Sequence, residues 1–137
     1  MIGIGIVGIG FMGVTHFRAI DNVRGARVTA ICTRDRRKLK GDWRKIQGNF
    51  GGSGGRQDVS KLACYEDIEA LLADPKVDLV DLCLPTNMHV EWTMRALAAG
   101  KHVLLEKPIA LAMKDADRLV AEAGKRKLQF MVAHVLR

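Results

Sequence analysis

Short apolar runs alternate along the chain with segments whose apolar residues recur at helical spacing. Near-continuous apolar runs are typical of strands in a parallel sheet that helices cover on both faces. This pattern predicts six strands, at residues 2–7, 27–32, 63–65, 79–84, 102–105 and 128–135. It predicts helices at residues 12–20, 35–46, 66–73, 87–99 and 112–123, the last two stopped by Gly100 and Gly124. We therefore expect an α/β fold, a doubly wound parallel sheet with strand order 3-2-1-4-5-6.

The first predicted strand runs directly into a Gly-x-Gly-x-x-Gly sequence, and a predicted helix follows it. In such a turn Gly8 lets the chain leave the strand tightly, Gly10 leaves room for a pyrophosphate, and Gly13 allows close helix packing. The helix N-terminus also presents N–H groups to an anion. A glycine-rich turn without a ligand is the alternative, because 14 glycines in 137 residues can produce this spacing by chance. The context favours a Rossmann dinucleotide-binding turn, formed by Gly8, Ile9, Gly10, Phe11, Met12 and Gly13.

Length and composition indicate one globular domain, since 48% of the 137 residues are hydrophobic and 27% are charged. No run approaches the ~18 apolar residues of a membrane span, and no signal peptide is visible, so we expect a cytoplasmic protein with no membrane partner. The three cysteines form no CxxC pair, which favours free thiols in a reducing compartment. The four histidines lack metal-binding spacing, so no metal is expected.

The net charge of +7 is unevenly distributed, because residues 34–45 contain seven basic and two acidic side chains. A basic cluster can attract phosphate of any origin, including nucleic acid. The chain has only seven aromatic residues, and none alternates with basic residues in the manner of a stacking platform. We therefore expect no nucleic-acid partner, and a steep salt-dependent affinity for DNA or RNA would contradict this.

The end of the second predicted strand bears on cofactor choice. An NAD site usually places a carboxylate about 20 residues after the glycine turn, whereas an NADP site offers a small hydroxyl and an arginine. Thr33 and Arg34 occupy that position, and Asp35 follows one or two positions late, where it can cap the next helix. NADP is therefore favoured over NAD. A solvated helix face is the alternative, and it accounts well for Lys38 and Lys40 but poorly for Arg34.

Glu106-Lys107-Pro108 follows the fifth predicted strand, where a lysine would lie over the crevice of the sheet. Its ammonium can donate to a substrate oxygen, and a cis Lys107–Pro108 bond can form in such a turn. The alternative is a surface lysine before a helix-starting proline. His134 and Arg137 follow the last strand and are candidates for substrate or cofactor contact.

Two other histidines lie near the starts of predicted elements. His89 either faces the nicotinamide half of a cofactor or simply starts a helix, and His102 begins a strand in a structural role.

Three segments in this order resemble the N-terminal domain of the glucose–fructose oxidoreductase / inositol dehydrogenase / rhizopine catabolism (Gfo/Idh/MocA) family: Gly8–Gly13, Leu84–His89 and Gly100–Pro108. The resemblance implies NAD(P)-dependent hydride transfer at a secondary alcohol of a sugar, sugar derivative or cyclitol. It implies that Lys107 hydrogen-bonds the reacting oxygen and that Glu106 contacts the nicotinamide ribose. The cofactor site that it implies also includes Leu84, Pro85, Thr86, Asn87, His89 and Pro108.

Members of that family carry a second α/β domain that shapes the substrate pocket and supplies a proton-transfer partner. The resemblance covers residues 1–137 as the NAD(P)-binding domain, so we expect the chain to bind a dinucleotide and to be nearly inactive alone. The parent enzyme would be a homo-oligomer with a small polyhydroxylated substrate. A non-catalytic NAD(P)(H) sensor is the alternative. An insertion at residues 42–61, which carries a glycine-rich loop, has no predicted role.

Overall fold

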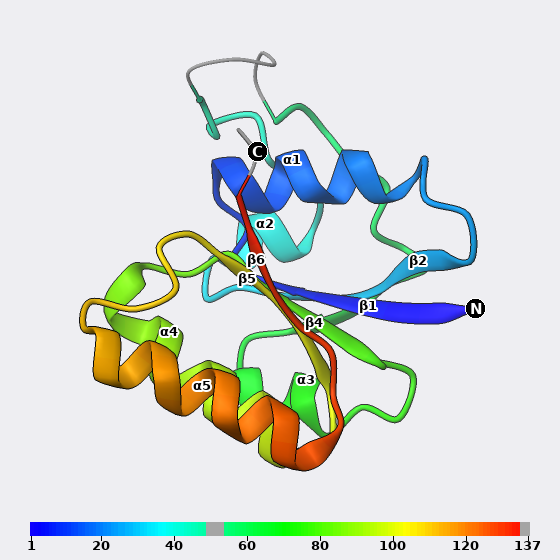
Figure 1. Ribbon diagram of the computed structural model, residues 1–137. Helices are drawn as coiled ribbons and strands as arrows, with labels where there is room; N and C mark the ends of the chain where they lie inside the picture. The colour runs from blue at the N-terminus through cyan, green and yellow to red at the C-terminus, as the bar shows by residue number, and fades with distance from the viewer. Residues whose placement is uncertain (49–53, 135–137) are drawn as a thin grey trace.

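The structure is a computed structural model, which describes residues 1–48 and 54–134. Its centre is a six-stranded parallel sheet in the order β3-β2-β1-β4-β5-β6, as predicted (Figure 1). The strands are β1 (Ile2–Val7), β2 (Ala26–Cys32), β3 (Ala63–Tyr65), β4 (Leu79–Leu82), β5 (His102–Glu106) and β6 (Phe130–Ala133). The helices are α1 (Phe11–Ile20), α2 (Arg36–Leu39), α3 (Ile68–Leu72), α4 (His89–Ala98) and α5 (Met113–Arg126), with a 3₁₀ turn η1 (Thr86–Met88) before α4.

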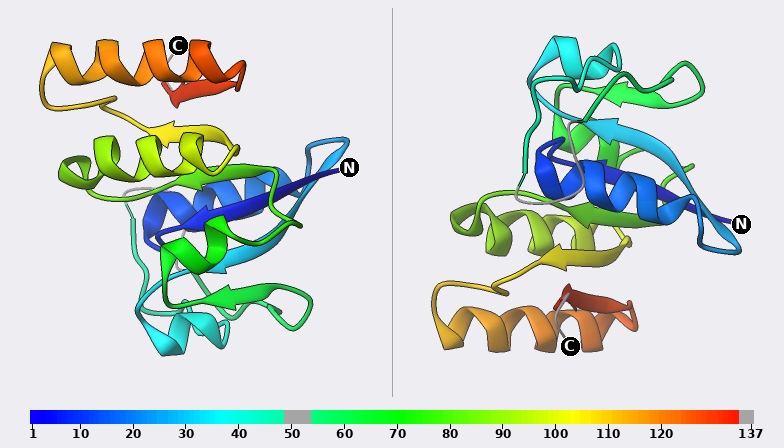
Figure 2. Two further views of the ribbon diagram at one scale, coloured as in Figure 1. Left: turned by 90° about the horizontal axis from the view of Figure 1, so that it is seen from below. Right: turned by 90° about the horizontal axis from the view of Figure 1, so that it is seen from above.

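Helices cover both faces of the sheet, which explains why its strands are apolar on both sides. Figure 2 shows α3, α4 and α5 across one face and α1 across the other. The face under α1 buries Ile4, Ile6, Ile31 and Trp43. The opposite face buries a separate and larger cluster, which includes Val80, Leu82, Leu97, Leu105 and Leu119.

The strand register brings the carboxyl ends of the strands to one edge of the sheet. Val7 at the end of β1 pairs with Cys32 of β2 on one side and with Leu82 of β4 on the other. Leu82 pairs in turn with Leu105, and the next residue of β5 pairs with Ala133 at the end of β6. The order of the strands reverses at β1, so the segments that follow β1, β2 and β4 enclose the crevice where such sheets bind ligands.

The prediction of a helix over residues 35–46 is wrong in its length, because α2 contains only Arg36–Leu39. Asp35 caps it as expected, accepting a hydrogen bond from the Arg37 N–H. The chain then leaves the helix through Gly41, whose φ of +77° lies in the left-handed region. Burial of the next aromatic side chain, Trp43, overrides the helical spacing of this segment.

Trp43 is fully buried under α1. Its indole N–H donates to the Lys38 carbonyl at 2.8 Å, and its ring packs edge-on against Phe17 with centroids 4.9 Å apart. The Arg18 guanidinium donates to the Gly54 carbonyl at 2.9 Å, which attaches the far end of the insertion to the same helix. The described part of the insertion at 42–61 therefore completes the core under α1. Residues 49–53 of its glycine-rich loop lie outside the described residues.

The two predicted glycine stops have different outcomes. Gly100 ends α4 as expected, with a φ of +75°. Gly124 does not end α5, which continues to Arg126 and stops where Lys127 adopts a φ of +56°. The Lys127 N–H caps the last turn by donating to the Ala123 and Gly124 carbonyls. The helix can continue past Gly124 because a glycine inside a helix costs only about 1 kcal/mol relative to alanine.

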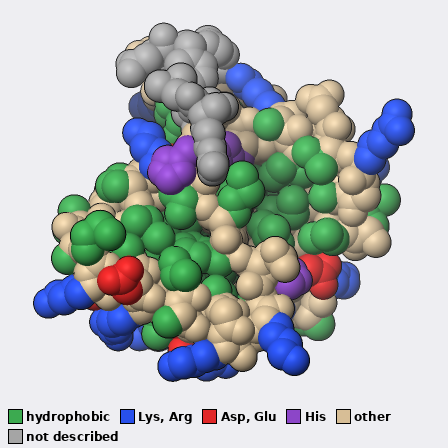
Figure 3. Space-filling model, viewed as in Figure 1, with side chains coloured by type: hydrophobic (Ala, Val, Ile, Leu, Met, Phe, Trp, Pro, Cys, Tyr) green, Lys and Arg blue, Asp and Glu red, His purple; other side chains and the backbone are tan. Residues whose placement is uncertain are grey.

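The strand β6 forms one edge of the sheet, and an exposed loop connects β5 to α5. Figure 3 shows apolar side chains spread across this side of the molecule. Leu111, Met113 and Met131 are each at least 65% exposed. Within residues 1–48 and 54–134, no helix has the length and apolar character needed to cross a bilayer.

Replacing Trp43 with alanine is expected to lower the free energy of unfolding by about 3–5 kcal/mol, since it empties the core under α1 and removes the indole donor. Urea unfolding followed by circular dichroism would measure this loss. Trp43→Phe should recover part of the stability by refilling the space. Trp92→Ala, at a half-buried position on the other face, is the matched control and should cost less.

Candidate functional site

The glycine turn is held by its backbone contacts with both neighbouring strands. Gly8 has a φ of +95°, and its N–H donates to the Cys32 carbonyl at 2.9 Å. A Cβ on Gly8 would overlap the Cys83 carbonyl, and a Cβ on Gly13 would overlap the Gly8 carbonyl. Nothing lies within 4 Å of a Cβ placed on Gly10. Two of the glycines therefore serve close packing, whereas the space at Gly10 is open.

The first turn of α1 lies at this glycine turn. Gly10 is its N-cap and offers no side chain to the helix N-terminus. A helix N-terminus without a side-chain cap is a suitable place for a phosphate group, which would accept hydrogen bonds from backbone N–H groups.

Lys38 holds the backbone of the glycine turn, a contact that was not predicted from the sequence. Its ammonium donates to the Ile9 carbonyl at 2.7 Å, and its side chain is half-buried. The expectation that Lys38 belongs to a solvated helix face is therefore wrong. The aliphatic part of a lysine can cross the core while its charge satisfies a carbonyl, and spacing alone does not show this.

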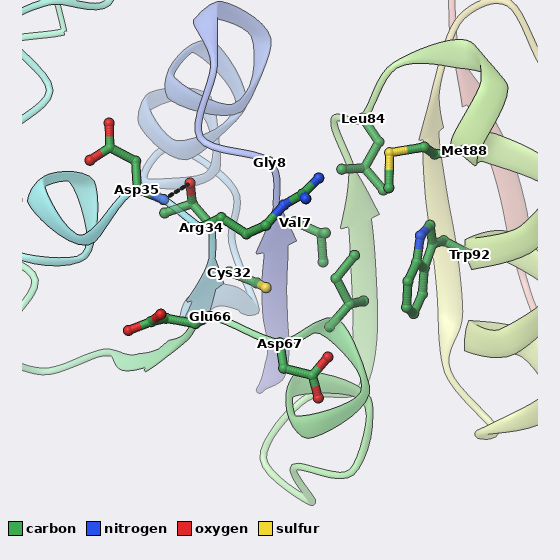
Figure 4. A pocket seen from close by; sticks show the side chains of 12 residues that line it. Val7, Gly8, Cys32, Arg34, Asp35, Glu66, Asp67, Leu84, Met88 and Trp92 are labelled. Carbon is green, nitrogen blue, oxygen red and sulfur yellow. Dashed lines mark hydrogen bonds between the residues drawn. The ribbon is translucent and has the colours of Figure 1, made fainter.

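A pocket of about 440 Å³ opens beside the turn, between the segments that follow β1, β2 and β4. Figure 4 shows the side chains around it. The lining residues are Val7, Gly8, Cys32, Thr33, Arg34, Asp35, Glu66, Asp67, Ile68, Leu84, Met88 and Trp92. The pocket thus brings together the glycine turn, the Thr33–Arg34 pair and Leu84, three segments that the sequence analysis assigned to the cofactor.

The polar side chains around the pocket come from residues 33–35 and from Glu66 and Asp67. The Asp35 carboxylate accepts hydrogen bonds from the backbone and guanidinium of Arg37, which lower its pKa. Arg36 and Arg44 pair with Glu66 and Asp42. Arg34 is the one arginine of residues 34–45 without an ion pair inside the described chain, and it extends over the pocket toward Gly8 (Figure 4).

One apolar wall of the pocket comes from the segment after β4 and the first turn of α4, and most of it was not predicted from the sequence. Met88 and Trp92 face the pocket beside Leu84 (Figure 4). The Trp92 indole nitrogen is buried and has no hydrogen-bond partner inside the described residues, and the Arg95 guanidinium lies 5.1 Å from its ring centroid. The available signal was position, because Trp92 lies about one helical turn beyond His89, in the helix that follows a central strand.

Lys107 follows β5 at the same edge of the sheet. Its side chain is exposed and has no partner within the described residues, and the Lys107–Pro108 bond is cis. His134 follows the residue of β6 that pairs with Glu106, so Lys107 and His134 leave neighbouring strands side by side. His134 is exposed, whereas Arg137 lies outside the described residues.

His89 starts α4 and is fully buried. Its two ring nitrogens lie 2.8 Å from the Pro108 carbonyl and 2.8 Å from the Leu84 carbonyl. The imidazole therefore joins the turn after β4 to the turn that carries Lys107. In the first of these turns, Pro85 and Asn87 are exposed and Thr86 is half-buried. His102 begins β5 and accepts a hydrogen bond from the Gln129 N–H, a structural role as expected.

Glu106 turns its carboxylate into the interior. Its side chain lies against His16 of α1, which also contacts Asp81 in the middle of the sheet. One ring nitrogen of His16, one carboxylate oxygen of Asp81 and the Cys83 sulfur all lie within 4.8 Å of one another. The spacing of these residues in the sequence does not reveal this convergence. The one visible sign was a carboxylate, Asp81, inside an otherwise apolar strand.

Gly13→Ala is expected to lower the free energy of unfolding by about 3 kcal/mol, because the obstructing atom is a backbone carbonyl that cannot move aside. Gly10→Ala should cost at most about 1 kcal/mol, since its Cβ meets no atom. Chemical unfolding of both variants measures the difference. Equal losses would show that the turn is packed differently.

Comparisons with known proteins agree with this geometry. The model of an oxidoreductase family with an NAD-binding Rossmann fold, Gfo/Idh/MocA, matches residues 2–134. Myo-inositol 2-dehydrogenase of Thermotoga maritima is 33% identical over 122 residues, which are 89% of this chain and 33% of that protein. Inositol 2-dehydrogenase of Paracoccus denitrificans is 34% identical over 130 residues, 92% of this chain and 35% of that protein.

Two solved structures show the same arrangement. A putative oxidoreductase from Klebsiella pneumoniae superposes with a TM-score of 0.81 at 30% identity, covering 98% of this chain and 35% of that one. KijD10, a 3-ketoreductase from Actinomadura kijaniata solved with TDP-benzene and NADP, gives 0.78 at 33% identity, covering 96% and 37%. The chain thus spans about a third of the length of these relatives. It belongs to the Gfo/Idh/MocA oxidoreductase family and forms its NAD-binding Rossmann domain.

Proposed function

We propose that this chain is the NADP(H)-binding domain of an oxidoreductase that transfers hydride at a secondary alcohol or ketone of a sugar, sugar derivative or cyclitol. The observation that carries the proposal is the convergence of the glycine turn, the Arg34 pocket and the Lys107 turn at one edge of the sheet. A dinucleotide spans such an edge, with its pyrophosphate at the helix N-terminus and its two halves on either side of the switch in strand order.

The adenosine half would occupy the pocket beside Thr33 and Arg34, with its base against the wall formed by Met88 and Trp92. Arg34 supports NADP, because its unpaired guanidinium can bind a 2′-phosphate at two points. Asp35 is poorly placed to accept a hydrogen bond from the 2′-hydroxyl of NAD, since its carboxylate already binds Arg37. KijD10, one of the similar structures, was solved with NADP.

The nicotinamide half would lie on the other side of the turn, beside Pro85, Thr86 and Asn87. There the exposed ammonium of Lys107 can donate a hydrogen bond to the reacting oxygen and exchange a proton with it. His134, on the neighbouring strand, is a candidate substrate contact. The inositol dehydrogenases among the relatives support a polyhydroxylated substrate. Because the chain spans about a third of their length, we propose that a further domain of the whole protein completes the substrate pocket.

Side-by-side titration of the chain with NADPH and NADH, followed by calorimetry at moderate salt, tests the cofactor assignment. NADPH should bind at least about tenfold more tightly, which is ~1.4 kcal/mol. Arg34→Ala should remove that preference and leave NADH affinity unchanged. Arg44→Ala, at an exposed arginine that pairs with Asp42 and does not line the pocket, is the matched control.

Tighter binding of NADH would contradict the NADP assignment while keeping the dinucleotide site. An equal loss of both affinities in Arg34→Ala would show that this side chain does not read the 2′-phosphate. Failure of the chain to bind either dinucleotide would contradict the proposed function itself.

In the whole protein, Lys107→Met should lower kcat for alcohol oxidation by about 10²–10⁴, the usual contribution of a positioned proton donor. The affinity for the dinucleotide should change little, because the ammonium acts on the substrate oxygen. Steady-state kinetics with a panel of inositols and sugars would measure both. Lys114→Met, at an exposed site on α5, should leave kcat unchanged. An unchanged kcat in Lys107→Met would exclude the proposed role.

A further inference from the structure

Four polar side chains meet inside the molecule, between α1 and the centre of the sheet. His16 Nδ1 lies 2.9 Å from Asp81 Oδ2 and 3.1 Å from Asp81 Oδ1. Its other ring nitrogen, Nε2, lies 3.2 Å from Glu106 Oε1. The Asp81 side chain has no exposed surface, and those of Glu106 and His16 are only 8% and 12% exposed. The Cys83 thiol lies 3.5 Å from Nδ1 and 3.6 Å from Asp81 Oδ1.

The partners of the two ring nitrogens determine how many protons the His16 imidazole must carry. An ionised carboxylate is an acceptor only, and a neutral imidazole has one N–H and one lone pair. A neutral ring would therefore direct its lone pair at one of the two carboxylates in a buried setting, where unpaired charge is costly. An imidazolium donates its Nδ1–H to Asp81 and also places its positive charge 3.2 Å from Glu106 Oε1, between the two carboxylates.

The remaining contacts agree with a cation at this position. Within the described residues, Glu106 Oε1 accepts no hydrogen bond, so the ring of His16 is its nearby source of positive charge. Burial acts to lower the pKa of His16, but the hydrogen bond that it donates to Asp81 and the charges of Asp81 and Glu106 outweigh burial and raise the pKa. Burial and the same carboxylates raise the pKa of the Cys83 thiol, which keeps it neutral.

The second oxygen of Glu106 connects this cluster to the proposed catalytic turn. Glu106 Oε2 accepts a hydrogen bond from the Lys107 backbone N–H at 3.1 Å. The ring of His16 thereby links α1, which starts at the glycine turn, to the backbone of the residue that would act on the substrate. We propose that His16 is a buried imidazolium that acts as a positioning residue, holding the Glu106 carboxylate and through it the Lys107 turn. The positioning part of this inference rests on the proposed function of Lys107.

The protonation state can be measured directly in the isolated chain by ¹⁵N NMR of its histidine rings. At pH 7.5 an ordinary imidazole, with a pKa of about 6.5, is about nine-tenths neutral. We expect both ring nitrogens of His16 to show imidazolium shifts at that pH. A neutral His16 ring at pH 7.5 would overturn the inference. So would a shift of its Nδ1 signal on adding stoichiometric Zn²⁺, because a metal site would then explain the cluster.

The link to Lys107 has its own readout, the amide shift of the Lys107 N–H in the same titration. We expect this shift to follow the deprotonation of His16 with the same midpoint as pH rises. His16→Gln and His16→Asn, which retain an amide NH₂ donor but no charge, should abolish that titration. His89→Gln, at the histidine that contacts the Pro108 carbonyl, and His134→Gln, on the neighbouring strand, should retain it, which excludes an effect of these two histidines.

A Lys107 amide that does not titrate with His16 in the wild-type chain would overturn the positioning role, even if both His16 variants fail to fold. Nucleotide binding is measured separately. A chain with an imidazolium at His16 that binds neither NADPH nor NADH would contradict the proposed function and leave the protonation state of the cluster standing.

Discussion

The close approach of backbone to backbone at the glycine turn is the constraint on which the rest of the site depends. Gly8 lies against the carbonyls of Cys32 and Cys83, and Gly13 lies against Gly8. The missing Cβ atoms of these two glycines let the backbones of α1 and of the segments after β1 and β4 approach closely, so the helix N-terminus lies at the switch in strand order. The pocket beside Arg34 and the turn that carries Lys107 take their places on either side of that point.

Buried polar groups form a second level of organisation around the same edge. His89 joins the carbonyls of the turns that follow β4 and β5, and Lys38 holds the carbonyl of Ile9. The pair of carboxylates on β4 and β5 requires a compensating charge, which His16 provides. A polar group can remain inside such a core only when its hydrogen bonds or charge are satisfied, so each of these contacts restricts the geometry of a loop.

Prediction from the sequence succeeded where hydrophobic period and glycine chemistry act locally. All six strands, their order and the capping of α2 by Asp35 agree with expectation. It failed over residues 40–46, where burial of Trp43 against Phe17 outweighs helical spacing. It failed again at Gly124, because the lysine three residues later adopts the left-handed conformation that ends α5.

The residues of the candidate site divide along the same line. The glycine turn, Thr33–Arg34 and the Lys107 turn could be located from the sequence, because parallel strands deliver their carboxyl ends to one edge and each motif immediately follows a strand. Lys38 and the His16–Asp81–Glu106 cluster could not, because the partners of Lys38 and His16 lie 29 to 90 residues away, and Trp92 could not, because only packing on the sheet turns it toward the pocket. Local periodicity places a residue on an element, but only packing determines which side chain lies opposite it and whether a charge there is compensated.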